Sequence, residues 1–90
     1  MKGCNPENFE KCITQGWEAV FTIDGVLFFY ERSGTDEGYR LVMYRGNECI
    51  LNEEILSMHE CLDTVLSTEI FEGKHLKDCY DDMVVKSAYY

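Results

Sequence analysis

Residues 17–23 alternate between two faces with the period of a β-strand, one face wholly apolar and the other formed by Glu18, Val20 and Thr22. One face carries Trp17, Ala19, Phe21 and Ile23. Asp24-Gly25 follows the strand and accepts the positive φ angles of a two-residue type I′ turn. The sequence therefore predicts a β-hairpin. Its register pairs are Ile23–Val26, Phe21–Phe28 and Ala19–Tyr30.

A third strand is predicted over Tyr39 to Arg45, after a polar loop at residues 33–38, and Gly46-Asn47 would close this meander. If Arg32 pairs with Tyr39, Glu31 lies beside Arg40 as a favourable cross-strand charge pair. The other pairs of this register are Tyr30–Leu41 and Phe28–Met43.

A short helix is predicted before the sheet. Asn5 is a suitable cap, Pro6 suits the first helical position, and Gly16 suits the end of the helix. The residues at helical spacing form one apolar stripe: Phe9, Cys12 and Ile13.

A longer helix is predicted after the meander, because apolar residues between Ile55 and Leu66 follow a 3.6-residue period. Asn52 would cap this helix, and Glu53 and Glu54 would occupy its first turn. The helix is expected to pack on the sheet face that carries Trp17 to Met43 and to form the core with it.

The segment after this helix is harder to assign. Ile70-Phe71 is typical of a short extended segment, and Glu72-Gly73-Lys74 is typical of a turn. Leu76, Cys79 and Tyr80 suggest a third, short helix. Residues 83–90 fit either a continuation of that helix or a strand, and the bare edges of a three-stranded sheet favour the strand.

These elements predict an α+β fold in a single domain over residues 1–90. It consists of an N-terminal helix, a three-stranded antiparallel meander with a possible fourth C-terminal strand, and one long and one short helix packed on the sheet. The hydrophobic fraction of 46% is too high for a disordered chain.

The second face of the predicted sheet is also partly apolar. Its apolar residues include Val20, Leu27, Phe29, Val42 and Tyr44. Either the first helix or the C-terminal tail crosses this face, or another protein covers it. An apolar patch rimmed by charged residues is typical of a contact site.

The formal net charge is −9, and the acids are denser in the C-terminal part. Residues 1–51 carry 8 acids and 5 bases, whereas the rest carries 9 acids and 3 bases. A negative surface repels phosphates, so direct binding of nucleic acid is disfavoured and a basic protein partner is favoured. The candidate partner-binding acids are Glu69, Glu72, Asp78, Asp81 and Asp82, which at helical spacing could mimic a row of phosphates.

The chain carries no convincing catalytic or metal signature. Its five cysteines are odd in number, and none has C-x-x-C spacing. No apolar signal region or membrane span is present, so reduced thiols in the cytoplasm of a bacterial host cell are expected. His75 and Cys79 are four apart and could form a thiol–base pair on a helix, but a structural cysteine is favoured. No cofactor and no metal site are expected.

The order of elements over Asn5 to Asp82, together with the length and charge, resembles small acidic anti-CRISPR proteins of bacterial phages. One group of these inhibitors blocks a type II CRISPR effector nuclease. Its acidic surface occupies the cleft that would read the short duplex motif beside the target. The stretch I-F-E-G-K-H-L-K-D-C-Y-D-D, Ile70 to Asp82, is also similar to the ending of small bacterial and phage-borne proteins.

This resemblance implies a non-enzymatic inhibitor whose acids, between Glu69 and Asp82, face the basic surface of a nucleic-acid-handling protein. An anti-CRISPR protein that acts as a DNA mimic is the sharpest form of this hypothesis. The alternative is a structural or adaptor module that forms a homodimer through Val20, Phe29, Val42 and Tyr44. A thiol enzyme that uses Cys79 and His75 ranks last.

Overall fold

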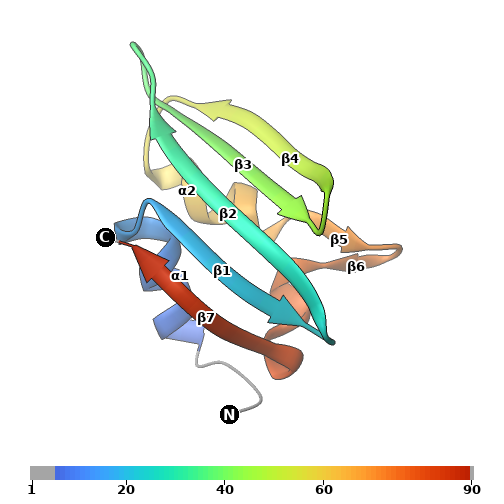
Figure 1. The fold of residues 1–90 in the computed structure, drawn as a ribbon. Coiled ribbons are helices and arrows are strands. Elements are labelled where there is room, and N and C mark those ends of the chain that lie inside the picture. The colour runs from blue at the N-terminus through green and yellow to red at the C-terminus, as the bar shows by residue number, and fades with distance from the viewer. Residues whose placement is uncertain (1–5, 90) are drawn as a thin grey trace.

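The computed structural model describes residues 6–89, which form an α+β fold of helices packed on an antiparallel sheet (Figure 1). The elements in chain order are α1 (Pro6–Gln15), β1 (Glu18–Ile23), β2 (Val26–Gly34), β3 (Tyr39–Arg45), β4 (Glu48–Ile55), α2 (His59–Leu66), β5 (Glu69–Phe71), β6 (Lys74–His75), the 3₁₀ helices η1 (Leu76–Asp78) and η2 (Tyr80–Asp82), and β7 (Met83–Tyr89). The expected cap Asn5 lies outside the described residues.

The main sheet has five strands in the order β4-β3-β2-β1-β7, and β5 and β6 form a separate small hairpin. Both α1 and α2 lie on the same side of the main sheet (Figure 1). The α+β class is therefore confirmed, but the sheet is larger than the predicted meander by two strands.

The first hairpin has the predicted turn and register. Asp24 and Gly25 have φ angles of 53° and 80°, as a type I′ turn requires at both central positions. The pairs are Ile23–Val26, Phe21–Phe28 and Ala19–Tyr30. A two-residue turn that requires positive φ angles at both central residues thus sets the register of β1 and β2.

The predicted register between β2 and β3 is wrong by two residues. Gly34, rather than Arg32, pairs with Tyr39, and Glu31 faces Val42 instead of Arg40. The reason is a compact turn: Thr35 N donates to Gly38 O at 2.9 Å, and Gly38 N donates to Thr35 Oγ1 at 2.9 Å. This turn lets β2 continue through Gly34. A shift of two keeps every side chain on its predicted face.

The prediction that Asn52 caps a helix is also wrong, because residues 48–55 form β4. Gly46, with a φ angle of 58°, turns the chain back onto β3. Arg40 then donates from Nη1 to Asn52 Oδ1 at 2.7 Å and from Nη2 to Glu54 Oε2 at 3.2 Å. Asn52 and Glu54, whose residue types are common at the N-terminus of a helix, thus serve as cross-strand partners of Arg40. Helix α2 begins later, at His59.

The segment after α2 forms β5, a turn and β6, which agrees with the predicted extended segment and turn. The predicted short helix is replaced by η1 and η2, each of three residues. The C-terminal strand is confirmed. It is β7, which runs antiparallel to β1 and covers that edge of the meander, with an irregularity between Val20 and Phe21.

The core lies between the sheet and the two α-helices and is built on aromatic rings. Phe21 and Phe28 stack with their centroids 5.4 Å apart, and Phe9 of α1 meets Phe21 edge-on at 5.4 Å. The predicted helical stripe is buried, since Phe9 and Ile13 are 0% exposed and Cys12 is 8% exposed. Trp17 departs from its predicted core position, because it is 45% exposed and covers Arg32 instead.

The C-terminal end of α1 is buried against two polar side chains of β2. Tyr30 donates from its hydroxyl to Ile13 O at 3.4 Å, and Arg32 Nη1 donates to Ile13 O at 3.4 Å and to Thr14 O at 2.7 Å. These bonds satisfy carbonyl groups that have no partner within the helix. Burial, with the Cys61 thiol 3.4 Å from the hydroxyl, raises the pKa of Tyr30 well above its ordinary value, so it stays a neutral donor.

Arg32 is only 6% exposed, and its guanidinium is held between aromatic rings. Its Cζ atom lies 4.6 Å from the centroid of the Trp17 ring and 5.6 Å from that of Tyr39. A guanidinium is weakly hydrated and stacks well on aromatic faces, which makes this position suitable for arginine rather than lysine. The negative end of the α1 dipole adds to the attraction.

We predict that Arg32→Met lowers the free energy of unfolding by about 1–3 kcal/mol, because the buried carbonyls of α1 lose a charged donor. Arg40→Met is the matched control. Arg40 is exposed and paired with Glu54, so its loss should cost only about 0.2–1 kcal/mol. Urea unfolding followed by circular dichroism measures both values. An equal or smaller loss for Arg32→Met than for Arg40→Met would contradict this account of the α1 end.

Candidate functional site

The five predicted partner-binding acids are all exposed, and they lie on the segment between α2 and β7. Glu69 is in β5, Glu72 in the β5–β6 turn, Asp78 in η1, and Asp81 and Asp82 in η2. The single helical row expected from their spacing does not form, since no α-helix spans them. They are instead spread over a small hairpin and two 3₁₀ turns, and we call this segment, residues 69–82, the acidic segment.

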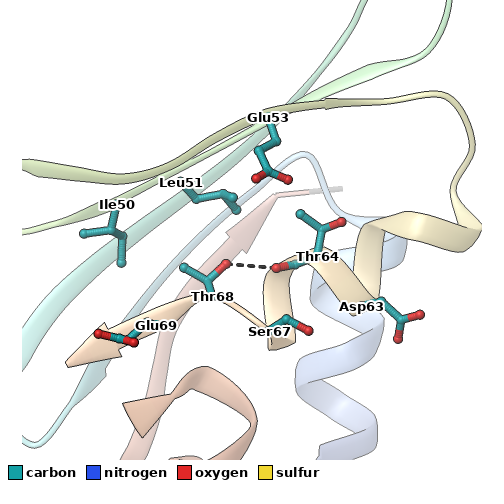
Figure 2. Close-up of a pocket in the computed structure, with 8 residues that line it drawn as sticks. All are labelled: Ile50, Leu51, Glu53, Asp63, Thr64, Ser67, Thr68 and Glu69. Carbon is teal, nitrogen blue, oxygen red and sulfur yellow. Dashed lines mark hydrogen bonds between the residues drawn. The ribbon is translucent and has the colours of Figure 1, made fainter. Parts of the chain in front are cut away.

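A second acidic feature is an open groove of about 490 Å³ between β4 and the C-terminal half of α2 (Figure 2). Its lining consists of Ile50, Leu51, Glu53, Asp63, Thr64, Ser67, Thr68 and Glu69. We call it the β4–α2 groove. The lining residues are three acids, three residues with hydroxyl groups and two aliphatic residues, and they include no lysine, arginine or histidine. In Figure 2 the Glu53 carboxylate extends toward α2, whereas the Asp63 carboxylate points away from β4.

Each part of the groove is positioned by a different element. Figure 2 shows Ile50, Leu51 and Glu53 extending from β4 toward the helix, with Thr64 and Thr68 opposite them. Thr68 Oγ1 donates to Thr64 O at 2.9 Å, and this bond closes the end of α2. The chain then enters β5, which brings Glu69 to the same groove.

Two of the groove carboxylates, Glu53 and Asp63, were missed by the sequence reasoning. The sequence predicts Glu53 in the first turn of a helix, but this residue lies in β4. A signal was present: Gly46-Asn47 is a two-residue turn, and the apolar residues Ile50 and Leu51 follow it, as expected of the second strand of a hairpin. Asp63 has no comparable signal, because its place in the groove depends on how α2 packs.

The outer face of the sheet carries the second predicted contact surface. The ladder aligns Val20 with Phe29, Phe29 with Tyr44, and Tyr44 with Cys49, which forms one row across four strands. Val42 lies on the same face of β3, two residues before Tyr44, and pairs with Glu31. Tyr44 is 38% exposed, and Leu27, beside Thr22, is 53% exposed. We call these residues the outer sheet face.

Neither segment that was expected to cover the outer sheet face does so. Figure 1 shows α1 on the opposite side of the sheet and β7 beside β1 at the edge. Val20, Phe29 and Val42 are half-buried. The row therefore remains accessible in the described part of the chain.

The predicted alternative of a thiol–base pair finds no geometric support. His75 lies in β6 and Cys79 lies between the two 3₁₀ helices. The Cys79 thiol donates to the backbone oxygen of His75, at 3.6 Å, and not to its imidazole. Burial raises the pKa of the Cys79 thiol; nearby Lys74 opposes the rise and Asp78 adds to it. A raised pKa reduces the thiolate fraction at neutral pH and so reduces nucleophilicity.

Within residues 6–89, no group of three or more histidine, cysteine, aspartate or glutamate side chains is arranged to hold a metal ion. In the same range, no helix has both the length and the apolar character needed to cross a lipid bilayer. The chain matches no protein-family model, no curated protein and no solved structure. A function is therefore inferred from the acidic segment, the β4–α2 groove and the outer sheet face.

We predict a steep order of alkylation rates among the thiols. Cys49 is exposed, whereas Cys12, Cys61 and Cys79 are buried. In a Cys4→Ser background, Cys49 should react at least about tenfold faster than these three with iodoacetamide at pH 7.5. Because the pKa of Cys79 is raised, its labelling should accelerate only at pH values above the ordinary thiol range. Mass spectrometry of timed samples reads each rate, and labelling of Cys79 at the rate of Cys49 would support the thiol-enzyme alternative instead.

Proposed function

We propose that this protein is a non-enzymatic inhibitor that binds the basic, nucleic-acid-binding surface of a protein partner. The acidic segment makes the contact and stands in for nucleic acid phosphates. A CRISPR effector nuclease is the sharpest form of the partner hypothesis. The observation that carries the proposal is the exposure of Glu69, Glu72, Asp78, Asp81 and Asp82 on one continuous segment.

The charge of the whole chain supports the same kind of partner. A net charge of −9 on 90 residues produces a long-range negative field, which attracts a basic surface and repels free nucleic acid. Within the acidic segment, five carboxylates stand against only two lysines, Lys74 and Lys77. Such complementarity acts mainly on the association rate and on the choice of partner.

The local backbone also favours a preformed surface. Leu76 of η1 is 0% exposed, and Cys79, between the two 3₁₀ helices, is 5% exposed. Asp24 N donates to Asp82 O at 3.4 Å, which ties the end of the segment to the first hairpin. An anchored segment loses little backbone conformational entropy on binding. This increases the affinity that a given set of carboxylates can provide.

We predict that Glu72→Gln, Asp78→Asn, Asp81→Asn and Asp82→Asn, combined, weaken binding to the partner at least about tenfold at low salt. The combination leaves Glu69 unchanged because this residue also lines the β4–α2 groove. The first partners to test are type II CRISPR effector–guide complexes, with binding followed across a salt series and target cleavage assayed in parallel. Wild-type affinity should fall steeply as salt rises.

The matched control combines Glu10→Gln, Glu18→Gln, Asp36→Asn and Glu37→Gln, which remove the same charge from other elements. This variant should bind nearly as the wild type does, once the change in net charge is allowed for. Circular dichroism establishes that both variants are folded. The proposal fails for this partner class if the wild type does not bind at low salt and target cleavage remains intact. It fails for this segment if both variants lose the same affinity.

A second candidate function is a structural or adaptor module that forms a homodimer, and the uncovered outer sheet face favours it. Val20, Phe29 and Tyr44 are aligned across three neighbouring strands, with Leu27 exposed beside them. Two such faces packed together would bury their apolar side chains as in a β-sandwich. Glu18 and Glu31, paired on the same face, would lie at the margin of the contact.

For the homodimer, we predict a dimer at micromolar concentration that Phe29→Arg converts to a monomer, because a charge at the centre of the contact is costly to bury. Gln15→Arg is the control, since it adds the same charge at an exposed position of α1. Multi-angle light scattering at about 5–200 μM reads the mass. A wild-type monomer throughout this range would remove the second candidate, and so would a dimer that both substitutions leave intact.

A further inference from the structure

The strand β4 ends the main sheet, and one of its two edges has no neighbouring strand. Seven of its eight residues, Glu48–Ile55, pair with β3 on the other side, and Ile50 is left without a partner at an irregularity opposite Met43 and Tyr44. Among residues 6–89, no backbone–backbone hydrogen bond outside the β3–β4 ladder engages this strand, although the Cys49 thiol donates to Leu51 O at 3.4 Å. An edge of this kind presents alternating N–H and C=O groups to an extended segment of another chain.

The β4–α2 groove lies directly beneath this strand, on the side of α2 (Figure 2). Side chains of an added sixth strand alternate between the two faces of the sheet, so every second one would point toward the groove. No residue of β7, the other edge strand, lines this groove. The groove therefore belongs to the β4 edge, where it can receive the side chains of an added strand.

The charge of the groove selects a basic occupant. Its acidic lining residues are Glu53, Asp63 and Glu69, and its aliphatic lining residues are Ile50 and Leu51. Among residues 6–89, none of these three acids forms an ion pair with a lysine or an arginine. A lysine or arginine side chain has the matching form, with an aliphatic stem and a cationic end.

We propose that β4 and the β4–α2 groove together bind an extended basic segment of a partner protein, which adds to the sheet as a sixth strand. Backbone hydrogen bonds to β4 supply the register, and alternate lysine or arginine side chains enter the groove. The inference goes beyond the proposed function, because it requires a basic peptide strand and not a nucleic-acid-binding surface. It also uses residues outside the acidic segment, Glu69 excepted.

A simpler account is that acids near an edge strand only prevent sheets from pairing with one another. Glu48 and Glu54 fit that account, since each is exposed and paired with an arginine. Glu53 does not fit it as well, because its carboxylate extends toward α2 and into the groove (Figure 2). The two accounts differ in what they predict for the groove carboxylates, and this difference can be measured.

The probe is a seven-residue acetylated and amidated peptide that alternates threonine with lysine, so that its three lysines share one face of a strand. Its extended length of about 23 Å suits a strand of eight residues. Isothermal titration gives the affinity, and NMR of the ¹⁵N-labelled protein locates the site. The expected shifts fall on amides 48–55 and 63–69, and residues 83–89 of the other edge strand serve as the reference.

The test variant combines Glu53→Gln, Asp63→Asn and Glu69→Gln, and the control combines Glu10→Gln, Asp36→Asn and Glu37→Gln. The test variant should bind the peptide at least about tenfold more weakly, and the control should stay within about threefold of the wild type. The variant of the acidic segment that retains Glu69 should also bind normally. Normal peptide binding by that variant would separate this inference from the proposed function.

Backbone pairing is tested with two N-methylated peptides, one methylated at the lysine amides and one at the threonine amides. Alternate amides of a strand face opposite edges, so one of the two peptides should lose binding and the other should retain it. Three results would overturn the inference: absence of binding at millimolar peptide, shifts centred on residues 83–89, or equal binding by both methylated peptides. Self-association of the test variant without any loss of peptide affinity would establish the simpler account instead.

Discussion

The carbonyl groups at the end of α1 set the constraint around which the fold is built. These carbonyl groups lie inside the protein, where leaving one acceptor without a hydrogen bond would lower the free energy of unfolding by about 1–3 kcal/mol. Tyr30 and Arg32 supply the donors, and because they are two apart on β2, they lie on the same face of one strand. Helix α1 is thereby fixed against the centre of the sheet. The Cys61 thiol, 3.4 Å from the Tyr30 hydroxyl, extends the same network to α2.

Local sequence rules correctly predicted those parts of the fold where a residue type is compatible with only one backbone conformation or one position. Asp24-Gly25 requires a type I′ turn, so the first hairpin and its register were correct. The stripe of α1 and the strand β7 followed from periodicity and from the need to cover an edge. Polar residues with several uses misled the reasoning: Asn52 has the chemistry of a helix cap, but Arg40 on the neighbouring strand engages it. Such a choice is made by tertiary contacts, which no local pattern contains.

The candidate surfaces also divide into features that local patterns predict and features that depend on tertiary contacts. The two faces of the sheet could be assigned from alternation alone, and the assignment survived a register error because that error was of two residues. The exposure of the acids followed from their chemistry. The β4–α2 groove could not be predicted, since it requires β4, the end of α2 and β5 to be brought together. As a result, the acids of this chain divide between an exposed segment and a shaped groove, which suit different kinds of basic partner.

The pairing of β1 with β7 has a consequence for biosynthesis. Strands β1 to β4 form a meander of consecutive neighbours, so they can pair while the polypeptide is still emerging from the ribosome. Strand β1, however, is completed on its other edge only by residues 83–89, and Trp17 N donates to Tyr89 O at 2.7 Å. A nascent chain that stalls before this segment leaves this edge of β1 unpaired and exposed to solvent, and chaperones or proteases would meet it in that state.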